Sequence, residues 1–208
     1  MKMPPARATT MIAVATIASY FILAVAGLSE TADFIGGFIP ARLGGIELEG
    51  ALPVWITPLS ATLLHAGIVH LGFNLLILVY CGRSVEAAVG TFGTLLLYLI
   101  GAYAAALAQY LASPLDMSPM IGASGAISAL FGAYALLFGR PRDSNMPPRV
   151  AYALNVVWLA VAWVGIQLMI GFAMPGAGFT VAIWAHIGGF LAGLLLARPL
   201  LLLKYRSA

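Results

Sequence analysis

A serine between two glycines and a histidine ahead of two more are the residues of this sequence best suited to catalysis. Segment 122–125 reads Gly-Ala-Ser-Gly, so the hydroxyl of Ser124 stays accessible and another backbone can approach it. His186 precedes glycines at 189 and 193, and glycines four residues apart let two helices come close together. A histidine within hydrogen-bond reach of a serine activates it as a nucleophile. The two motifs therefore indicate serine-dependent acyl transfer, provided that the fold brings them together.

A second group of polar residues could stabilise the negative charge that such a reaction develops. His70 and Asn74 are four residues apart and share one face of a helix. A neutral imidazole and a carboxamide can each donate a hydrogen bond to one oxygen. Phe73 lies beside this face, whereas His65 lies well round the helix and nearer its outer end, where we expect it to hold the first loop.

Each of these motifs also has a plainer structural explanation. A small-residue face with a serine hydroxyl bonded to the preceding turn is common where membrane helices pack. A lone buried histidine such as His186 more often bonds a neighbouring carbonyl, and His70 with Asn74 can simply tie two helices together. The catalytic interpretation therefore depends on the motifs occurring together.

The composition places these residues in a membrane. Of the 208 residues, 62% are hydrophobic and 8% are charged, and the mean hydropathy is +1.01. A soluble domain is about 25% charged, so 10 Lys and Arg with 7 Asp and Glu cannot cover a water-soluble globule. A net charge of +3 without a basic stripe argues against nucleic-acid binding. With one cysteine and no Cys/His cluster, we expect no disulfide framework, no metal site and no cofactor.

Six apolar stretches are long enough to cross a bilayer core of roughly 30 Å as helices. They lie at residues 10–28, 64–83, 92–112, 120–138, 150–172 and 180–198. No internal repeat is visible, so an inverted-repeat transporter gains no support. The first loop, 29–63, carries apolar residues such as Phe38, and we expect it to lie on the outer leaflet with Trp55 at headgroup level. The predicted fold is an all-α membrane bundle of six transmembrane helices in one domain, residues 1–208.

Basic residues predict the orientation, because Lys and Arg flank membrane spans preferentially on the cytoplasmic side. With the N-terminus inside, nine basic residues face inward and only Arg42 faces outward. The inward residues are Lys2, Arg7, Arg83, Arg140, Arg142, Arg149, Arg198, Lys204 and Arg206. Both termini are therefore predicted to be cytoplasmic. The small residues at 24–26, after the first apolar stretch, leave a cleaved signal peptide open, which would not change the orientation downstream.

This orientation brings the candidate residues to one level in the membrane. His70, Ser124 and His186 lie 13, 16 and 12 residues before the inner arginines that end their spans. At about 1.5 Å per residue these separations are roughly 18 to 24 Å, which reach the outer third of the membrane core. Three helices thus carry a serine and two histidines at a similar depth.

In this order the motifs resemble the rhomboid family of intramembrane serine proteases. The resemblance covers most of the chain from about residue 35 onward, and it implies Ser124 as the nucleophile and His186 as the general base. It implies an oxyanion hole formed by His70, Asn74 and the backbone N–H of Ser124. The other residues of the matching motifs, with an implied supporting role, are Gly122, Gly125, Phe73, Gly189, Gly193, His65 and Glu86, the last a structural acid at the inner end of the second span.

The implied activity is cleavage of the transmembrane segments of other membrane proteins by a Ser–His dyad through an acyl-enzyme. The implied location is a bacterial inner membrane, with the site open to the outer side. Because the outer half of span 150–172 carries Gly165 and Gly171 and little charge, we expect substrate to enter beside that span. Two positions depart from the family pattern: Arg42 has no tryptophan before it, and Ser128 stands where many members have a tyrosine stacked on the catalytic histidine. A catalytically inactive relative that binds membrane proteins and a small transporter or channel are the competing functions.

Overall fold

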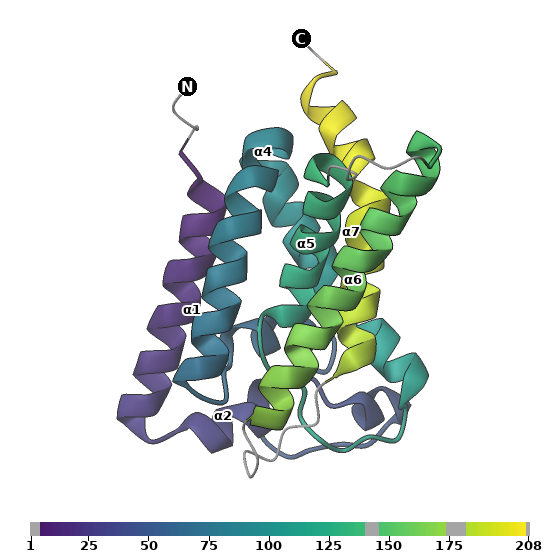
Figure 1. Ribbon diagram of the computed structural model, residues 1–208. Coiled ribbons are helices and arrows are strands. Elements are labelled where there is room, and N and C mark those ends of the chain that lie inside the picture. The colour runs from purple at the N-terminus through teal and green to yellow at the C-terminus, as the bar shows by residue number, and fades with distance from the viewer. Residues whose placement is uncertain (1–4, 140–145, 174–181, 207–208) are drawn as a thin grey trace.

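The computed structural model describes residues 5–139, 146–173 and 182–206, most of them in helices (Figure 1). The helices are α1 Arg7–Ala26, α2 Ser29–Gly36, η1 Pro40–Gly44, α3 Thr57–Ser60, η2 Ala61–Leu63, α4 Ile68–Ala112, α5 Ser124–Phe138, α6 Pro148–Ala173 and α7 Ile183–Lys204. Within these described ranges the only β pairing is an isolated bridge between Phe38 and Met120. The all-α prediction is confirmed.

Helix α4 consists of two helical arms joined at Gly90, where the backbone has φ 79° and ψ 169°. A positive φ is strained for residues with a side chain, and glycine adopts it at little cost. The chain reverses there, so that arm 68–89 leads away from the level of Ser124 and arm 91–112 returns to it. The first arm begins at Ile68, four residues later than the predicted span, so His65 lies in the preceding connection.

Helix α5 is shorter than the sequence predicts. Helices α1, α4, α6 and α7 are long and apolar enough to cross a membrane, whereas α5 has 15 residues. It begins at Ser124, and the predicted span began at residue 120. At about 1.5 Å per residue its length is about 22 Å, less than a bilayer core of about 30 Å. The helix is therefore shorter than the core that the predicted span would cross.

Small residues allow α5 to pack between the second arm of α4 and α7. A Cβ added at Gly101 of α4 would lie 2.5 Å from the Cβ of Ala129, and one added at Gly193 of α7 would overlap the Ala129 carbonyl oxygen. Every residue of α5 from Ser124 to Leu130 is buried. Lipid tails are as apolar as leucine, so close backbone contact of this kind drives helix association in membranes.

A buried carboxylate fixes α1 to α4. Glu86 Oε1 accepts the backbone N–H of Ala8 at 2.8 Å, and Oε2 accepts the N–H and the hydroxyl of Thr9 at 2.9 and 2.8 Å. The Thr91 hydroxyl donates a fourth hydrogen bond to Oε1 at 2.9 Å. The N–H groups in the first turn of a helix have no acceptor inside it, and a negative charge there is favourable. Glu86 therefore caps α1 from 78 positions away.

The start of α1 and the end of α7 lie at the same end of the bundle (Figure 1). Lys204 of α7 donates from Nζ to the Ala87 carbonyl at 2.8 Å, one residue after the glutamate that caps α1. The Gly90 turn is at this end as well, because a Cβ there would lie 3.7 Å from the Lys204 side chain. Ser124 lies at the opposite end, with the first loop.

The first loop supports the segment that precedes α5. The Phe38 N–H donates to the Met120 carbonyl at 3.0 Å, and the Met120 N–H donates back at 2.8 Å. The Gly122 N–H donates to the Ala61 carbonyl at 2.9 Å. Phe38 is 1% exposed, whereas Trp55 is 66% exposed. The loop packs inward against the protein and leaves Trp55 on its surface.

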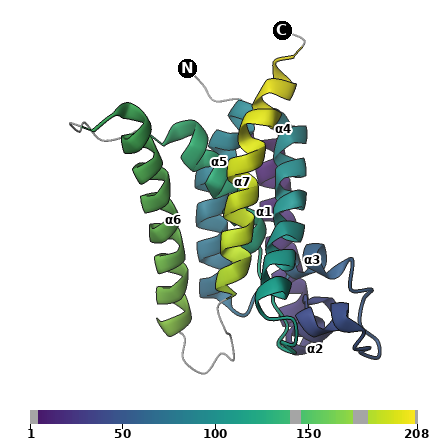
Figure 2. The same cartoon turned by 90° about the vertical axis from the view of Figure 1, so that its right-hand side faces the viewer.

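Helix α6 stands apart from the other long helices over much of its length, as Figure 2 shows. Trp163 is the only buried residue among those of α6 whose side chains are described. The Tyr152 hydroxyl donates to the carbonyl of Leu136 on α5. These two aromatic residues connect α6 to the bundle.

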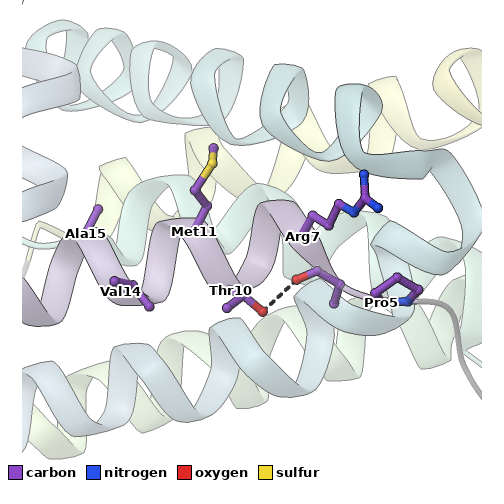
Figure 3. Close-up of a pocket in the computed structure, with 7 residues that line it drawn as sticks. Pro5, Arg7, Thr10, Met11, Val14 and Ala15 are labelled. Atoms are coloured by element: carbon purple, nitrogen blue, oxygen red, sulfur yellow. Dashed lines mark hydrogen bonds between the residues drawn. The ribbon is translucent and has the colours of Figure 1, made fainter.

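A shallow groove of about 610 Å³ lies on α1 (Figure 3). It is lined by Pro5, Ala6, Arg7, Thr10, Met11, Val14 and Ala15. These residues lie in the first half of α1 or just before it, at the end that Glu86 caps and away from Ser124. The groove is separate from the residues described next.

Candidate active site

Ser124 is the first residue of α5, and a glycine turn presents it. Gly122 has φ +111°, a conformation that residues with a side chain rarely adopt. A Cβ at this position would also lie 2.7 Å from Cε1 of the His70 ring. Both constraints require glycine. The turn leaves the Ser124 N–H at the start of the helix, where the helix itself provides no acceptor.

The hydroxyl of Ser124 lies beside the ring of His186. Its Oγ is 2.8 Å from Nε2 of His186, and the two residues are 8% and 5% exposed. His186 is in the first turn of α7. One turn later a Cβ at Gly189 would overlap the carbonyl oxygen of Gly125, so glycine allows the two backbones to touch. At this distance a proton can pass from the hydroxyl to the imidazole.

The first arm of α4 brings His70 to the same turn and carries Asn74 one helical turn further along. The His70 ring lies against Gly122, two residues before the serine. Asn74 is 4% exposed and donates from Nδ2 to the His70 carbonyl at 2.9 Å, which leaves its second N–H for another acceptor. Phe73, between them in sequence, is 41% exposed. One arm thus supplies two side chains that can donate hydrogen bonds.

His65 contacts this turn from the connection before α4. The backbone N–H of Ala123 donates to His65 Nε2 at 3.5 Å, and the His65 ring centroid is 5.0 Å from that of His70. This contact is with the backbone beside Ser124, whereas the sequence predicted that His65 lies on the second span and holds the first loop.

Trp163 of α6 is a residue near the site that sequence reasoning missed. Its Nε1–H donates to the Ser128 hydroxyl at 2.7 Å, and Ser128 donates to the Ser124 carbonyl at 2.7 Å. Its ring stands edge-on to the ring of His186, with the centroids 6.4 Å apart. Tryptophan in a membrane span is usual at the ends. The central position of Trp163 in span 150–172 was the available signal.

Comparison with known proteins identifies the family. A family model described as the Rhomboid domain matches residues 53–203, a range that includes the serine and all three histidines. The chain belongs to the rhomboid family. Its membership in this family and its apolar helices make it an integral, multi-pass membrane protein.

Rhomboid relatives with curated names match most of this chain. It is 32% identical over 183 residues to "Rhomboid protease GluP" of Bacillus subtilis, which covers 88% of this chain and 33% of the relative. It is 30% identical over 190 residues to "Rhomboid protease GlpG" of Pectobacterium atrosepticum, which covers 91% and 61%. "Rhomboid-related protein 2" of Mus musculus is 31% identical over 137 residues, 65% of this chain and 45% of the relative. The chain therefore spans between a third and about three fifths of these relatives.

The two residues that depart from the rhomboid pattern, Arg42 and Ser128, each make a hydrogen bond in this chain. Arg42 donates from Nη2 to the Leu52 carbonyl at 2.8 Å, which closes part of the first loop. Ser128 bonds the indole of Trp163, so an aromatic ring stands near the histidine although it comes from α6. Within the described ranges, no three His, Cys, Asp or Glu side chains gather as metal ligands would.

Proposed function

We propose that this chain is a serine endopeptidase that cleaves transmembrane segments of other membrane proteins. The 2.8 Å separation between Oγ of Ser124 and Nε2 of His186 carries this proposal. The two residues are buried and lie 62 positions apart in the chain. A serine with a histidine at this distance has its general base in place. The relatives named as rhomboid proteases support the same chemistry.

In the proposed mechanism His186 carries its proton on Nδ1 and accepts the Ser124 proton at Nε2. As that proton leaves, Oγ attacks the carbonyl carbon of the scissile peptide, and the carbonyl oxygen becomes an anion. His186 then gives the proton to the departing amine, which leaves an acyl group on Ser124. Water, deprotonated by the same nitrogen, hydrolyses this ester and restores the serine. These steps require no metal ion or cofactor.

We propose a Ser–His dyad in which no carboxylate takes part, and the acidic residue of α4 has another use. Glu86, the acidic residue of α4, is occupied by four hydrogen bonds from α1 and Thr91 at the other end of the bundle. We assign it the structural role of holding α1 on α4.

The anion formed in each step needs hydrogen-bond donors that are already in position. We assign this oxyanion hole to the Ser124 N–H, which begins α5, and to the side chains of His70 and Asn74. The N-terminal end of the α5 dipole favours the same negative charge. Gly122 supports the assignment, because a side chain there would collide with the His70 ring.

We propose six spans, counting both arms of α4, in the inner membrane of a bacterium, with residues 1–208 forming one domain. The nine-to-one excess of basic residues assigns the two termini to the cytoplasm and Ser124 to the outer side. Because α5 is short, the serine lies below the outer surface, and water reaches it from outside. A transmembrane substrate approaches from the lipid beside α6, and Phe73 borders that side of the site.

Purified protein incubated with a single-span reporter substrate, in detergent and in liposomes, tests this function. We expect cleavage by the wild type and none by Ser124→Ala. Ser84→Ala is the matched control, because the Ser84 hydroxyl bonds the Tyr80 carbonyl on the first arm of α4, and it should cleave like the wild type. A small serine-directed phosphonate should label Ser124, as located by mass spectrometry.

Three results would contradict the proposal in different ways. Label on another residue, or cleavage that survives Ser124→Ala, would remove Ser124 from the reaction. Binding of membrane proteins without any cleavage or labelling would indicate an inactive family member. Solute flux in liposomes that persists after Ser124→Ala, with no cleavage, would indicate a transporter.

A further inference from the structure

We propose that Trp163 is a positioning residue for His186 and that the Ser128 hydroxyl holds Trp163 in place. This role rests on the proposed function, because it presumes that His186 is the general base. A general base acts efficiently only when its ring is held in the reactive orientation, and side chains packed against the imidazole restrict how far it can tilt.

The indole of Trp163 occupies the space beside the imidazole. The two ring planes are inclined by 69° with their centroids 6.4 Å apart, which is the edge-to-face arrangement that aromatic rings prefer. Trp163 is 3% exposed and His186 is 5% exposed, so the contact is shielded from solvent. The Trp163 ring blocks the imidazole of His186 from tilting toward it. The imidazole is therefore kept in the orientation in which its Nε2 reaches Ser124.

Two hydrogen bonds in series anchor the indole to the helix of the nucleophile. Trp163 Nε1–H donates to Ser128 Oγ, and the Ser128 hydroxyl donates to the Ser124 carbonyl, each at 2.7 Å. A hydroxyl can donate one hydrogen bond and accept another at the same time. Ser128 is fully buried. The indole therefore keeps a fixed position relative to the turn that presents Ser124.

Aromatic neighbours complete this arrangement across three helices. The Phe131 ring of α5 is 5.1 Å from that of Trp163 and 6.1 Å from that of Phe190 on α7. Trp163 belongs to α6, whereas His186 belongs to α7. The orientation of the base therefore depends on where α6 lies, although α6 contributes no reacting group.

The labelling rate constant with the phosphonate, together with kcat and KM on the reporter substrate, tests this role. Trp163→Ala should lower the labelling rate and kcat by about 10²-fold, the scale of a small misplacement of a catalytic group. KM should stay near the wild-type value, because the substrate contacts are kept. Ser128→Ala keeps the whole indole and loses only its anchor, so its loss should be the smallest. Trp163→Phe keeps an aromatic ring but also loses the hydrogen bond to Ser128, so it should fall between Ser128→Ala and Trp163→Ala.

Tyr152→Phe is the matched control. It removes the hydrogen bond from α6 to the Leu136 carbonyl while leaving Trp163 in place, and it should label and turn over like the wild type. An equal loss in Tyr152→Phe would trace the effect to general loosening of α6 and overturn the positioning role.

The remaining outcomes separate this role from the function on which it rests. A folded Trp163→Ala variant with wild-type labelling and kcat would overturn the role and leave the protease proposal intact. If Trp163→Ala does not fold, wild-type rates in both Trp163→Phe and Ser128→Ala would overturn it. A wild type that neither labels nor cleaves would overturn both proposals.

Discussion

Gly189→Ala is expected to remove most of the activity by displacing α7, without altering a reacting group. Gly189 lies one turn after His186, where α7 touches α5. A Cβ there would overlap the Gly125 carbonyl oxygen and lie 3.0 Å from the Cβ of Ser128. Carbon atoms in contact are normally about 3.5–4.0 Å apart, and the Gly125 oxygen lies closer to the added Cβ than the Ser128 Cβ does, so α7 has to move away by about 1 Å or more.

This displacement acts on the Ser–His pair. A shift of about 1 Å lengthens the Ser124–His186 separation from 2.8 Å to about 3.8 Å, beyond hydrogen-bond reach. A misplacement of this size costs on the order of 10²-fold in rate. We therefore expect the labelling rate constant and kcat to fall about 10²-fold, with KM little changed. Overpacking should also lower the free energy of unfolding by about 1–3 kcal/mol.

Phosphonate labelling of Ser124, followed by mass spectrometry with thermal unfolding measured in parallel, is the assay. Gly165→Ala on α6 is the matched control, because a Cβ there has no neighbour within 4 Å. It should label at the wild-type rate. A folded Gly189→Ala variant that labels as fast as the wild type would refute the reasoning that this glycine contact sets the position of His186.

Three further predictions concern other residues. His186→Ala should abolish phosphonate labelling of Ser124. His70→Ala and Asn74→Ala should keep the labelling and lose about 10²–10³-fold in turnover, the cost of one oxyanion donor. If His186→Ala keeps the labelling and a folded His70→Ala loses it, His70 is the general base and His186 the oxyanion donor. Glu86→Gln replaces one of the two carboxylate oxygens that accept hydrogen bonds from α1 with an NH2 donor. It should therefore lower the free energy of unfolding by about 1–3 kcal/mol while labelling of Ser124 persists. Unchanged thermal unfolding would contradict this. Burial, with repulsion from nearby Glu30, raises the pKa of Asp33 from 3.8 to about 6 in the folded protein. The folded state therefore holds the Asp33 proton more tightly than the unfolded state, and the contribution of Asp33 to folding stability is full below pH 3.8 and is lost as pH rises through 6. Asp33→Asn should therefore gain thermal stability relative to the wild type between pH 4 and pH 7, and a pH-independent difference would contradict this.

Local features of the sequence predict the class of protein and the chemistry of its candidate site. The apolar stretches and sparse charges indicate membrane helices, because a polar backbone inside lipid must satisfy its own hydrogen bonds. Ser124 and His186 stand out because small residues around them permit helices to approach closely. Their separation of 2.8 Å was not predictable as a distance, but the motifs and their depth indicated that they could meet.

Helix ends were less predictable, because apolar composition continues past the residue where a helix begins. Residues 120–123 are as apolar as α5, yet the helix begins at Ser124. The cause is the preceding turn, in which Gly122 adopts φ +111° and its N–H is bonded to the Ala61 carbonyl. That bond joins segments 61 positions apart, so no local pattern reveals it.

Tertiary structure alone decided which polar groups satisfy one another. Glu86 caps a helix 78 positions away, and Trp163 bonds a serine 35 positions away, so neither partner follows from helical periodicity. The sequence determined that position 128 is a serine, where many rhomboid proteins have a tyrosine. Only the packing of α6 against α5 and α7 brings another aromatic ring beside His186, because that contact depends on how three separate helices are arranged in space.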